Sequence, residues 1–185
     1  MDWNKRLLFA AQRGDYAVSA ICFENGANAN FQDVNGNTIL HWAATQKSRA
    51  LVDLLVDYGA KLEARNANGV CPLHLACQHN NAQTALALIE RGADALSVDV
   101  SGKTPFDYAV RARAVATVIA LARYINGNLT DPIAGKTPLE YFSACMLSRL
   151  EIKKAIAGSA RLDAPSQARV HLMQNLPENI LAKRG

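Results

Sequence analysis

The apolar residues of this chain recur with the spacing of short amphipathic helices. Residues 51–56 read Leu-Val-Asp-Leu-Leu-Val, which places an apolar face at the i, i+3, i+4 positions of a helix. Gly59 follows, and glycine readily takes the left-handed conformation that ends a helix. Gly26 and Gly92 lie at equal distances before and after Gly59 and close comparable segments. The pattern predicts a series of short helices with a fixed period.

A second pattern, made of turn residues, has the same period of 33. Residues 68–76 read Asn-Gly-Val-Cys-Pro-Leu-His-Leu-Ala, and segments 35–43, 101–109 and 134–142 share that register. Four copies in one register indicate a repeat array, in which each unit packs on its neighbours. Because no unit covers its own apolar face, the array needs at least about three repeats for stability.

These segments resemble the ankyrin repeat, whose signature is Gly-x-Thr-Pro-Leu-His-x-Ala followed by two helices and a Gly-Ala turn. The resemblance covers about residues 2–165 and implies an all-α repeat solenoid, with helix pairs joined by β-turn or hairpin loops. We expect one domain over residues 1–165, built of about five units including caps: 2–32, 33–65, 66–98, 99–131 and 132–164. Residues 166–185 are expected to form a C-terminal capping helix or tail.

Several residues depart from the signature. Cys71 replaces the threonine that caps a first helix, and a thiol is a poor acceptor, so we expect this cap to be weaker by about 0.5–2 kcal/mol. Residues 125–128, Ile-Asn-Gly-Asn, replace a Gly-Ala turn, which predicts either a longer second helix or a reshaped loop. Asp107 and Glu140 occupy the histidine position and are expected to tune hydrogen bonds between repeats.

Composition narrows the class of protein. Hydrophobic residues make up 50% of the 185 residues, which is enough for a continuous core and argues against global disorder. The net charge of +4 is small and dispersed, whereas nucleic-acid binders usually carry a dense basic stripe. No apolar run approaches the roughly 20 residues that span a bilayer, and the N-terminus lacks the apolar core of a signal peptide.

The four cysteines are spread through expected helices, which is typical of reduced thiols in a cytoplasmic protein. Delivery of the protein into a host cell by a bacterium is the alternative location. The divergent linker at residues 125–132 and the unusual last repeat favour a bacterial protein.

A cluster of zinc-type ligands occurs at Cys71-x-x-His74-x-x-Cys77-x-His79. The resemblance gives His74 another role, because in the family this ring links neighbouring repeats by hydrogen bonds. Cys77 replaces a core alanine, and His79 falls at an exposed helix end. A structural zinc site usually takes its ligand pairs from two separated segments, so we expect no metal.

No catalytic or cofactor-binding pattern stands out. His41 has neither a nucleophile elbow nor a carboxylate pair around it in the sequence. The glycines recur singly as turn residues and do not form a phosphate-binding loop. We therefore expect a protein that is not an enzyme and holds no cofactor.

The resemblance places partner binding on the concave side, at the hairpin tips and the ends of the first helices. The candidate residues are Arg13, Asn35, Asn37, Thr45, Gln46, Arg65, Asn68, Val70, Gln78, His79, Lys103, Arg111, Arg113 and Lys136. The first half of this surface is rich in amides, and the second half turns basic, which predicts an acidic segment in the partner. The alternative is that these charges only solubilise the surface.

The leading interpretation is a non-catalytic protein–protein interaction module, an adaptor, scaffold or inhibitor that is monomeric by itself. It extends to a bacterial effector that acts on host proteins. The alternative is the recognition domain of a larger enzyme or effector whose catalytic part lies outside this chain. Nucleic acid and membrane are not expected partners, because the amide-rich half of the surface offers phosphates little charge.

Overall fold

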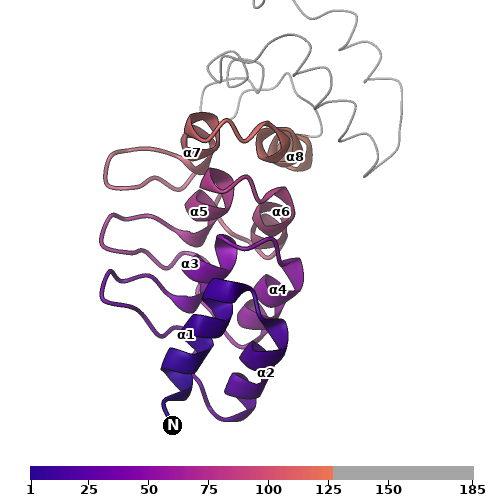
Figure 1. Ribbon diagram of the computed structural model, residues 1–185. Coiled ribbons are helices and arrows are strands. Elements are labelled where there is room, and N and C mark those ends of the chain that lie inside the picture. Colours follow the sequence, from indigo (N-terminus) through magenta and orange to yellow (C-terminus); the bar gives the residue numbers. More distant parts are fainter. Residues whose placement is uncertain (127–185) are drawn as a thin grey trace, which may run out of the picture.

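The computed structural model describes residues 1–126, which form eight helices. They are α1 (Trp3–Arg13), α2 (Tyr16–Glu24), α3 (Ile39–Ala44), α4 (Arg49–Asp57), α5 (Pro72–Gln78), α6 (Ala82–Glu90), α7 (Pro105–Arg111) and α8 (Val115–Asn126). Odd-numbered helices stack in one row and even-numbered helices in a second, and hairpin loops project beside the first row (Figure 1).

The predicted all-α solenoid is confirmed over these residues. Within residues 1–126 there is no β-strand, and the strand-like pairing is limited to a single bridge between Gln32 and Thr38. The expected unit 132–164, Glu140 and the expected C-terminal segment 166–185 lie outside the described residues.

The core consists of equivalent positions that recur once in every repeat. A column of large side chains on the first helices is at most 1% exposed: Leu7, Leu40, Leu73 and Phe106. One turn later, alanines at most 4% exposed form a second column: Ala10, Ala43, Ala76 and Ala109. The second helices add a third, fully buried column: Cys22, Leu55, Leu88 and Leu121. Because alanine is small, neighbouring first helices can approach closely while the larger columns fill the space around them.

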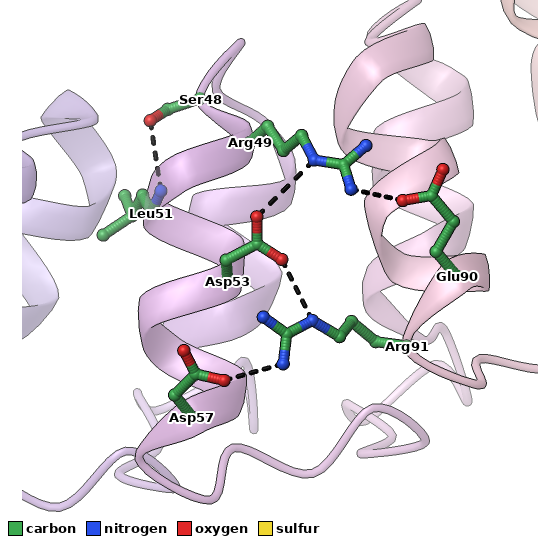
Figure 2. Close-up of polar contacts among 7 residues, drawn as sticks. All are labelled: Ser48, Arg49, Leu51, Asp53, Asp57, Glu90 and Arg91. Atoms are coloured by element: carbon green, nitrogen blue, oxygen red, sulfur yellow. Dashed lines mark hydrogen bonds and ion pairs between the residues drawn. The ribbon is translucent and has the colours of Figure 1, made fainter.

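Ion pairs join the outer helices α4 and α6 (Figure 2). The Arg91 guanidinium lies 3.0 Å from one carboxylate of α4, Asp53, and 2.6 Å from another, Asp57. Arg49 pairs with Glu90 and also lies 3.5 Å from Asp53. These groups are partly exposed, so each pair contributes little to stability by itself. Their effect is to pair Arg49 and Arg91 with carboxylates, so that both arginines are neutralised on the outer side of the molecule.

The hairpins are linked through their backbones. The Ala67 N–H donates to the Asn35 carbonyl at 3.1 Å, and the Val100 N–H donates to the Asn68 carbonyl at 3.2 Å. These are the same two positions one repeat apart. Neighbouring hairpins are therefore held at a fixed step that matches the packing of the helices behind them.

Buried histidines provide another link between repeats, as the sequence resemblance implies. The Thr38 N–H donates to His41 Nδ1 at 3.0 Å, so the proton of the neutral ring is on Nε2, which contacts the Val70 carbonyl at 2.8 Å. His74 makes the equivalent contact to the Lys103 carbonyl at 3.1 Å. Burial lowers the pKa of both imidazoles, and the hydrogen bonds to the carbonyls only partly offset it.

Asp107 stands at the same position in the next unit and behaves differently. Its Oδ2 accepts hydrogen bonds from the Thr104 N–H at 2.9 Å and from the Thr104 hydroxyl at 2.7 Å. The carboxylate caps the start of α7, but an ionised carboxylate has no proton to donate to a carbonyl.

Two departures from the signature have structural outcomes. The Cys71 thiol is directed toward Glu63 Oε2 at 3.7 Å, while the Cys71 N–H donates to His74 Nδ1 at 3.3 Å. The energetic weakness of this cap stays a prediction. For residues 125–128 the sequence predicted either a longer second helix or a reshaped loop. The structure has the longer helix, since α8 contains 12 residues whereas α2, α4 and α6 each contain 9.

Stability should fall on mild acidification. Because the folded pKa of His41 and His74 is lowered, the unfolded chain takes up protons first, below the ordinary pKa of about 6.5. Urea unfolding should give full stability above pH 7 and a loss of at most about 1.4 kcal/mol per histidine per pH unit between pH 6.5 and 5. The His41→Gln/His74→Gln variant, which keeps His79 and His171, should lose this slope; an unchanged slope would contradict the assignment.

Gly69→Ala should destabilise the protein more than Gly59→Ala. Both glycines have positive φ, +69° and +82°, so alanine is strained at either position. A Cβ at Gly69 would also lie 3.0 Å from the Val100 backbone nitrogen and Cγ1, whereas a Cβ at Gly59 meets nothing within 4 Å. Thermal unfolding of both variants measures the difference, and equal losses would show that the hairpins are not in this close contact.

Candidate functional site

A side chain at the start of each hairpin organises its turn. Asp99 Oδ1 accepts hydrogen bonds from the backbone N–H groups of Ser101 and Lys103 at 2.8 and 2.9 Å. Asp99 Oδ2 accepts a further bond from the Tyr108 hydroxyl at 2.8 Å, which fastens the hairpin to α7. Burial opposes the charge, yet these bonds outweigh it and hold the pKa of Asp99 below its usual value. Burial and the Asp99 carboxylate together raise the pKa of Tyr108 to about 12.

The earlier hairpins follow the same plan with one variation. Asp33 Oδ2 accepts from the Trp42 indole N–H at 3.1 Å, at the same nine-residue spacing as Asp99 and Tyr108. In the middle unit Leu75 cannot donate a hydrogen bond, and the neutral Asn66 replaces the aspartate. The Asn66 side-chain N–H₂ instead donates to Asn37 Oδ1 in the preceding hairpin at 2.8 Å.

A hollow of about 640 Å³ lies between the hairpin at residues 66–70 and the ends of α5 and α7. Its polar lining consists of Asn66, Asn68, Gln78, His79, Tyr108 and Arg111. Its apolar lining consists of Val70, Leu75 and Ala112. We call the surface made by the hairpins and the adjoining side of the first helices the groove face.

The polar groups of the hollow fall into two classes. Asn66 and Tyr108 form hydrogen bonds within the protein and therefore stiffen its wall. The other four polar side chains make no hydrogen bond or ion pair with another described residue: Asn68, Gln78, His79 and Arg111. The hollow therefore presents two carboxamides, an imidazole and a guanidinium to a ligand.

Arg111 contrasts with three other arginines of the described repeats, Arg49, Arg65 and Arg91. Arg49 and Arg91 are paired with carboxylates on the outer helices (Figure 2). Arg65 donates through one nitrogen to the Gly69 carbonyl at 3.0 Å and also to the Val98 carbonyl, so it braces two hairpins. Arg111 lies with Tyr108 in the lining of the hollow. Its guanidinium donors are therefore available to a ligand there.

The structure brings five candidates predicted from the sequence together in this hollow: Asn68, Val70, Gln78, His79 and Arg111. Val70 was expected to be exposed, and this expectation is wrong. Val70 is only 5% exposed, and its N–H and carbonyl bond to Asn66 Oδ1 and to the His41 ring. Val70 contributes only an apolar edge to the hollow.

The other candidates lie elsewhere on the groove face or are engaged in the fold. Arg13, Asn35 and Arg113 are exposed, whereas Lys103 is half-buried. Three more are half-buried and hydrogen-bonded within the protein: Asn37 to Asp33, Thr45 to the Trp42 carbonyl and Gln46 to Thr45. Lys136 lies outside the described residues.

Four lining residues were not predicted from the sequence: Asn66, Leu75, Tyr108 and Ala112. The sequence does contain a signal for Tyr108. This tyrosine follows the carboxylate Asp99 by nine residues, and the donor Trp42 follows Asp33 at the same spacing. That spacing indicates a ring held against its own hairpin. Leu75 and Ala112 carry no such mark.

The cysteine–histidine cluster of the middle unit is dispersed by the fold. His74 is held between the Cys71 N–H and the Lys103 carbonyl, whereas His79 is exposed in the hollow. Cys77 is fully buried, and burial raises the pKa of its thiol. Among the side chains of the described repeats, no group of three or more histidine, cysteine or acidic residues is placed to hold a metal ion.

The described helices are also too short or too polar to cross a lipid bilayer: none of α1–α8 qualifies as a candidate span.

Comparison with known proteins identifies the repeat. The family model for ankyrin repeats (3 copies) matches residues 7–99 and 66–132, ranges that overlap and together cover more than half of the chain. No curated protein matches the chain. Ankyrin repeats are generally protein–protein interaction modules and are typically non-catalytic. With its stacked helix pairs, its hairpins and this match, the chain belongs to the ankyrin-repeat family.

Proposed function

We propose that this chain is a non-catalytic binding module that holds an acidic segment of another protein against the groove face. The observation that carries the proposal is Arg111, an arginine in a hollow without a described hydrogen-bond or ion-pair partner, beside Asn68, Gln78 and His79. Such a set of donors is suited to carboxylates, since guanidinium–carboxylate bonds are charge-assisted and can be bidentate. Each such bond contributes roughly 1.5–3 kcal/mol.

The wall of the hollow supports binding by being preorganised. Asp99 receives three hydrogen bonds, two from its hairpin and one from Tyr108, so its carboxylate is occupied and does not take the Arg111 donors. Asn66 is likewise fixed by bonds to its own hairpin and to Asn37. A ligand therefore does not have to order these groups, and more of the contact energy remains as affinity.

The basic character of this end extends beyond the hollow. Arg113 is exposed two residues after Arg111, and Lys103 lies in the adjoining hairpin. Lys136, which lies outside the described residues, follows Lys103 by one period in the sequence, and the proposal includes it as a further cation. On the outer helices the charges of Arg49 and Arg91 are balanced by carboxylates, whereas no ion pair of Arg111 is described on the groove face.

The proposal covers two kinds of role that use this same surface. One is an adaptor, scaffold or inhibitor, and the other is the recognition part of a larger enzyme or effector. A reducing compartment such as the cytoplasm is part of the proposal. The free thiols of Cys22, Cys71 and Cys77 are all buried in the described repeats, which supports it. Burial raises the pKa of each of these thiols and keeps them protonated.

The Arg111→Glu/Arg113→Glu variant should lose its partner while remaining folded. Both side chains are exposed, and reversal places like charges against an acidic segment, so affinity should fall by roughly a hundredfold or more. Affinity capture from a lysate of the source cells, quantified by mass spectrometry, should show proteins retained by the wild type and absent with the variant. Circular dichroism and the melting temperature should be unchanged.

The matched control is Lys5→Glu/Lys61→Glu, which changes the net charge equally at two exposed residues away from the hollow. This control should retain the partner. Equal losses with both variants would show that only the overall charge matters, and capture unaffected by the first variant would refute the proposal.

A further inference from the structure

The tips of the hairpins form an apolar row beside the hollow. Val34, Ala67 and Val100 occupy the same hairpin position in three successive units, each one repeat after the last. Val34 is 100% exposed, Val100 is 75% exposed and Ala67 is also exposed. We call these three residues the ledge.

The ledge is continuous and rigid because its backbone links the hairpins. The N–H groups of Ala67 and Val100 donate to carbonyls of the preceding hairpin at 3.1 and 3.2 Å. Gly69 packs so closely on Val100 that a Cβ there would lie 3.0 Å from its backbone nitrogen and Cγ1. The side chains of the ledge are therefore presented at the fixed step of the repeats, about 8–10 Å if the hairpins keep the spacing of the helices.

Folding does not explain why the ledge is apolar. The residue after each ledge position is polar and exposed (Asn35, Asn68 and Ser101), so a polar side chain is tolerated at these tips. Isolated exposed apolar residues are ordinary, but a row of them along a face that also carries a hollow is typical of an interaction site. Asn68 connects the two features, since it follows Ala67 and lines the hollow.

We propose that the acidic segment in the hollow also carries apolar side chains that pack along the ledge. This inference rests on the proposed function and names its ligand more closely: an extended segment of the polyproline II type that contains both aliphatic or aromatic residues and aspartate or glutamate. Charge complementarity with Arg111 sets the acidic positions. The step of the ledge sets the apolar ones about three residues apart, because a chain in the polyproline II conformation advances about 3.1 Å per residue and returns to the same face every third residue.

The test uses the full chain of 185 residues and a displayed library of random 12-residue peptides. Enriched peptides should contain acidic residues and apolar residues three positions apart. A fluorescein-labelled synthetic peptide of an enriched sequence should then bind by fluorescence anisotropy. Its affinity should fall about tenfold or more with Val34→Ser/Val100→Ser, which removes apolar contact without adding charge.

The matched control is Ile21→Ser/Leu96→Ser. These apolar residues are exposed to 45% and 53% but lie off the ledge, so the peptide should bind the control as tightly as the wild type. Arg111→Glu is measured in parallel. Because the ledge side chains are solvent-exposed, all variants should retain the wild-type circular dichroism spectrum.

Four results would overturn the inference, and they separate it from the proposed function. In one result, the enriched peptides show no apolar pattern, lose affinity for Arg111→Glu and bind Val34→Ser/Val100→Ser as tightly as the wild type. This result refutes apolar packing on the ledge and leaves the proposed function intact. Failure to enrich any peptide, or binding that ignores Arg111, counts against both. If the free chain self-associates in sedimentation and Val34→Ser/Val100→Ser abolishes this, the ledge contacts a second copy instead.

Discussion

The close approach of neighbouring first helices is the constraint on which the rest of the structure depends. It is made possible by the alanine column that begins at Ala10 and recurs once in each repeat. The same step brings the His41 ring within 2.8 Å of the Val70 carbonyl and the Ala67 N–H within 3.1 Å of the Asn35 carbonyl. A larger side chain in the alanine column would widen the step and stretch both bonds at once, because interiors are close-packed and relax little.

The polar residues divide according to whether this step satisfies them. Thr38, His41 and Asn66 bond to groups in their own or the adjacent repeat and are therefore parts of the framework. Arg111 is the last residue of α7 and lines the hollow, and its side chain forms none of these framework bonds. The hollow is the natural place for a ligand, because four of its polar side chains form no hydrogen bond or ion pair with another described residue, whereas Asn66 and Tyr108 are bonded within the protein.

The sequence predicted the period and the helices, since both follow from spacing. It also predicted five residues of the hollow from their places in the repeat. It could not predict the burial of Val70, because this depends on a neighbouring element: the His41 ring that contacts the Val70 carbonyl lies on α3. Arg65 shows the same limit: its side chain spans two hairpins, and no local pattern marks an arginine that binds carbonyls.

The exchange of histidine for aspartate at residue 107 has a consequence for how the array unfolds. In a linear array, stability is a sum of unit terms and nearest-neighbour couplings, and the weakest coupling determines where cooperative unfolding stops. Two junctions are joined through an imidazole proton, from His41 and from His74, whereas Asp107 Oδ2 accepts hydrogen bonds from Thr104 within its own unit. We therefore expect the three units that contain His41, His74 and Asp107 to unfold as one cooperative block, because an imidazole link spans each of the two junctions between them.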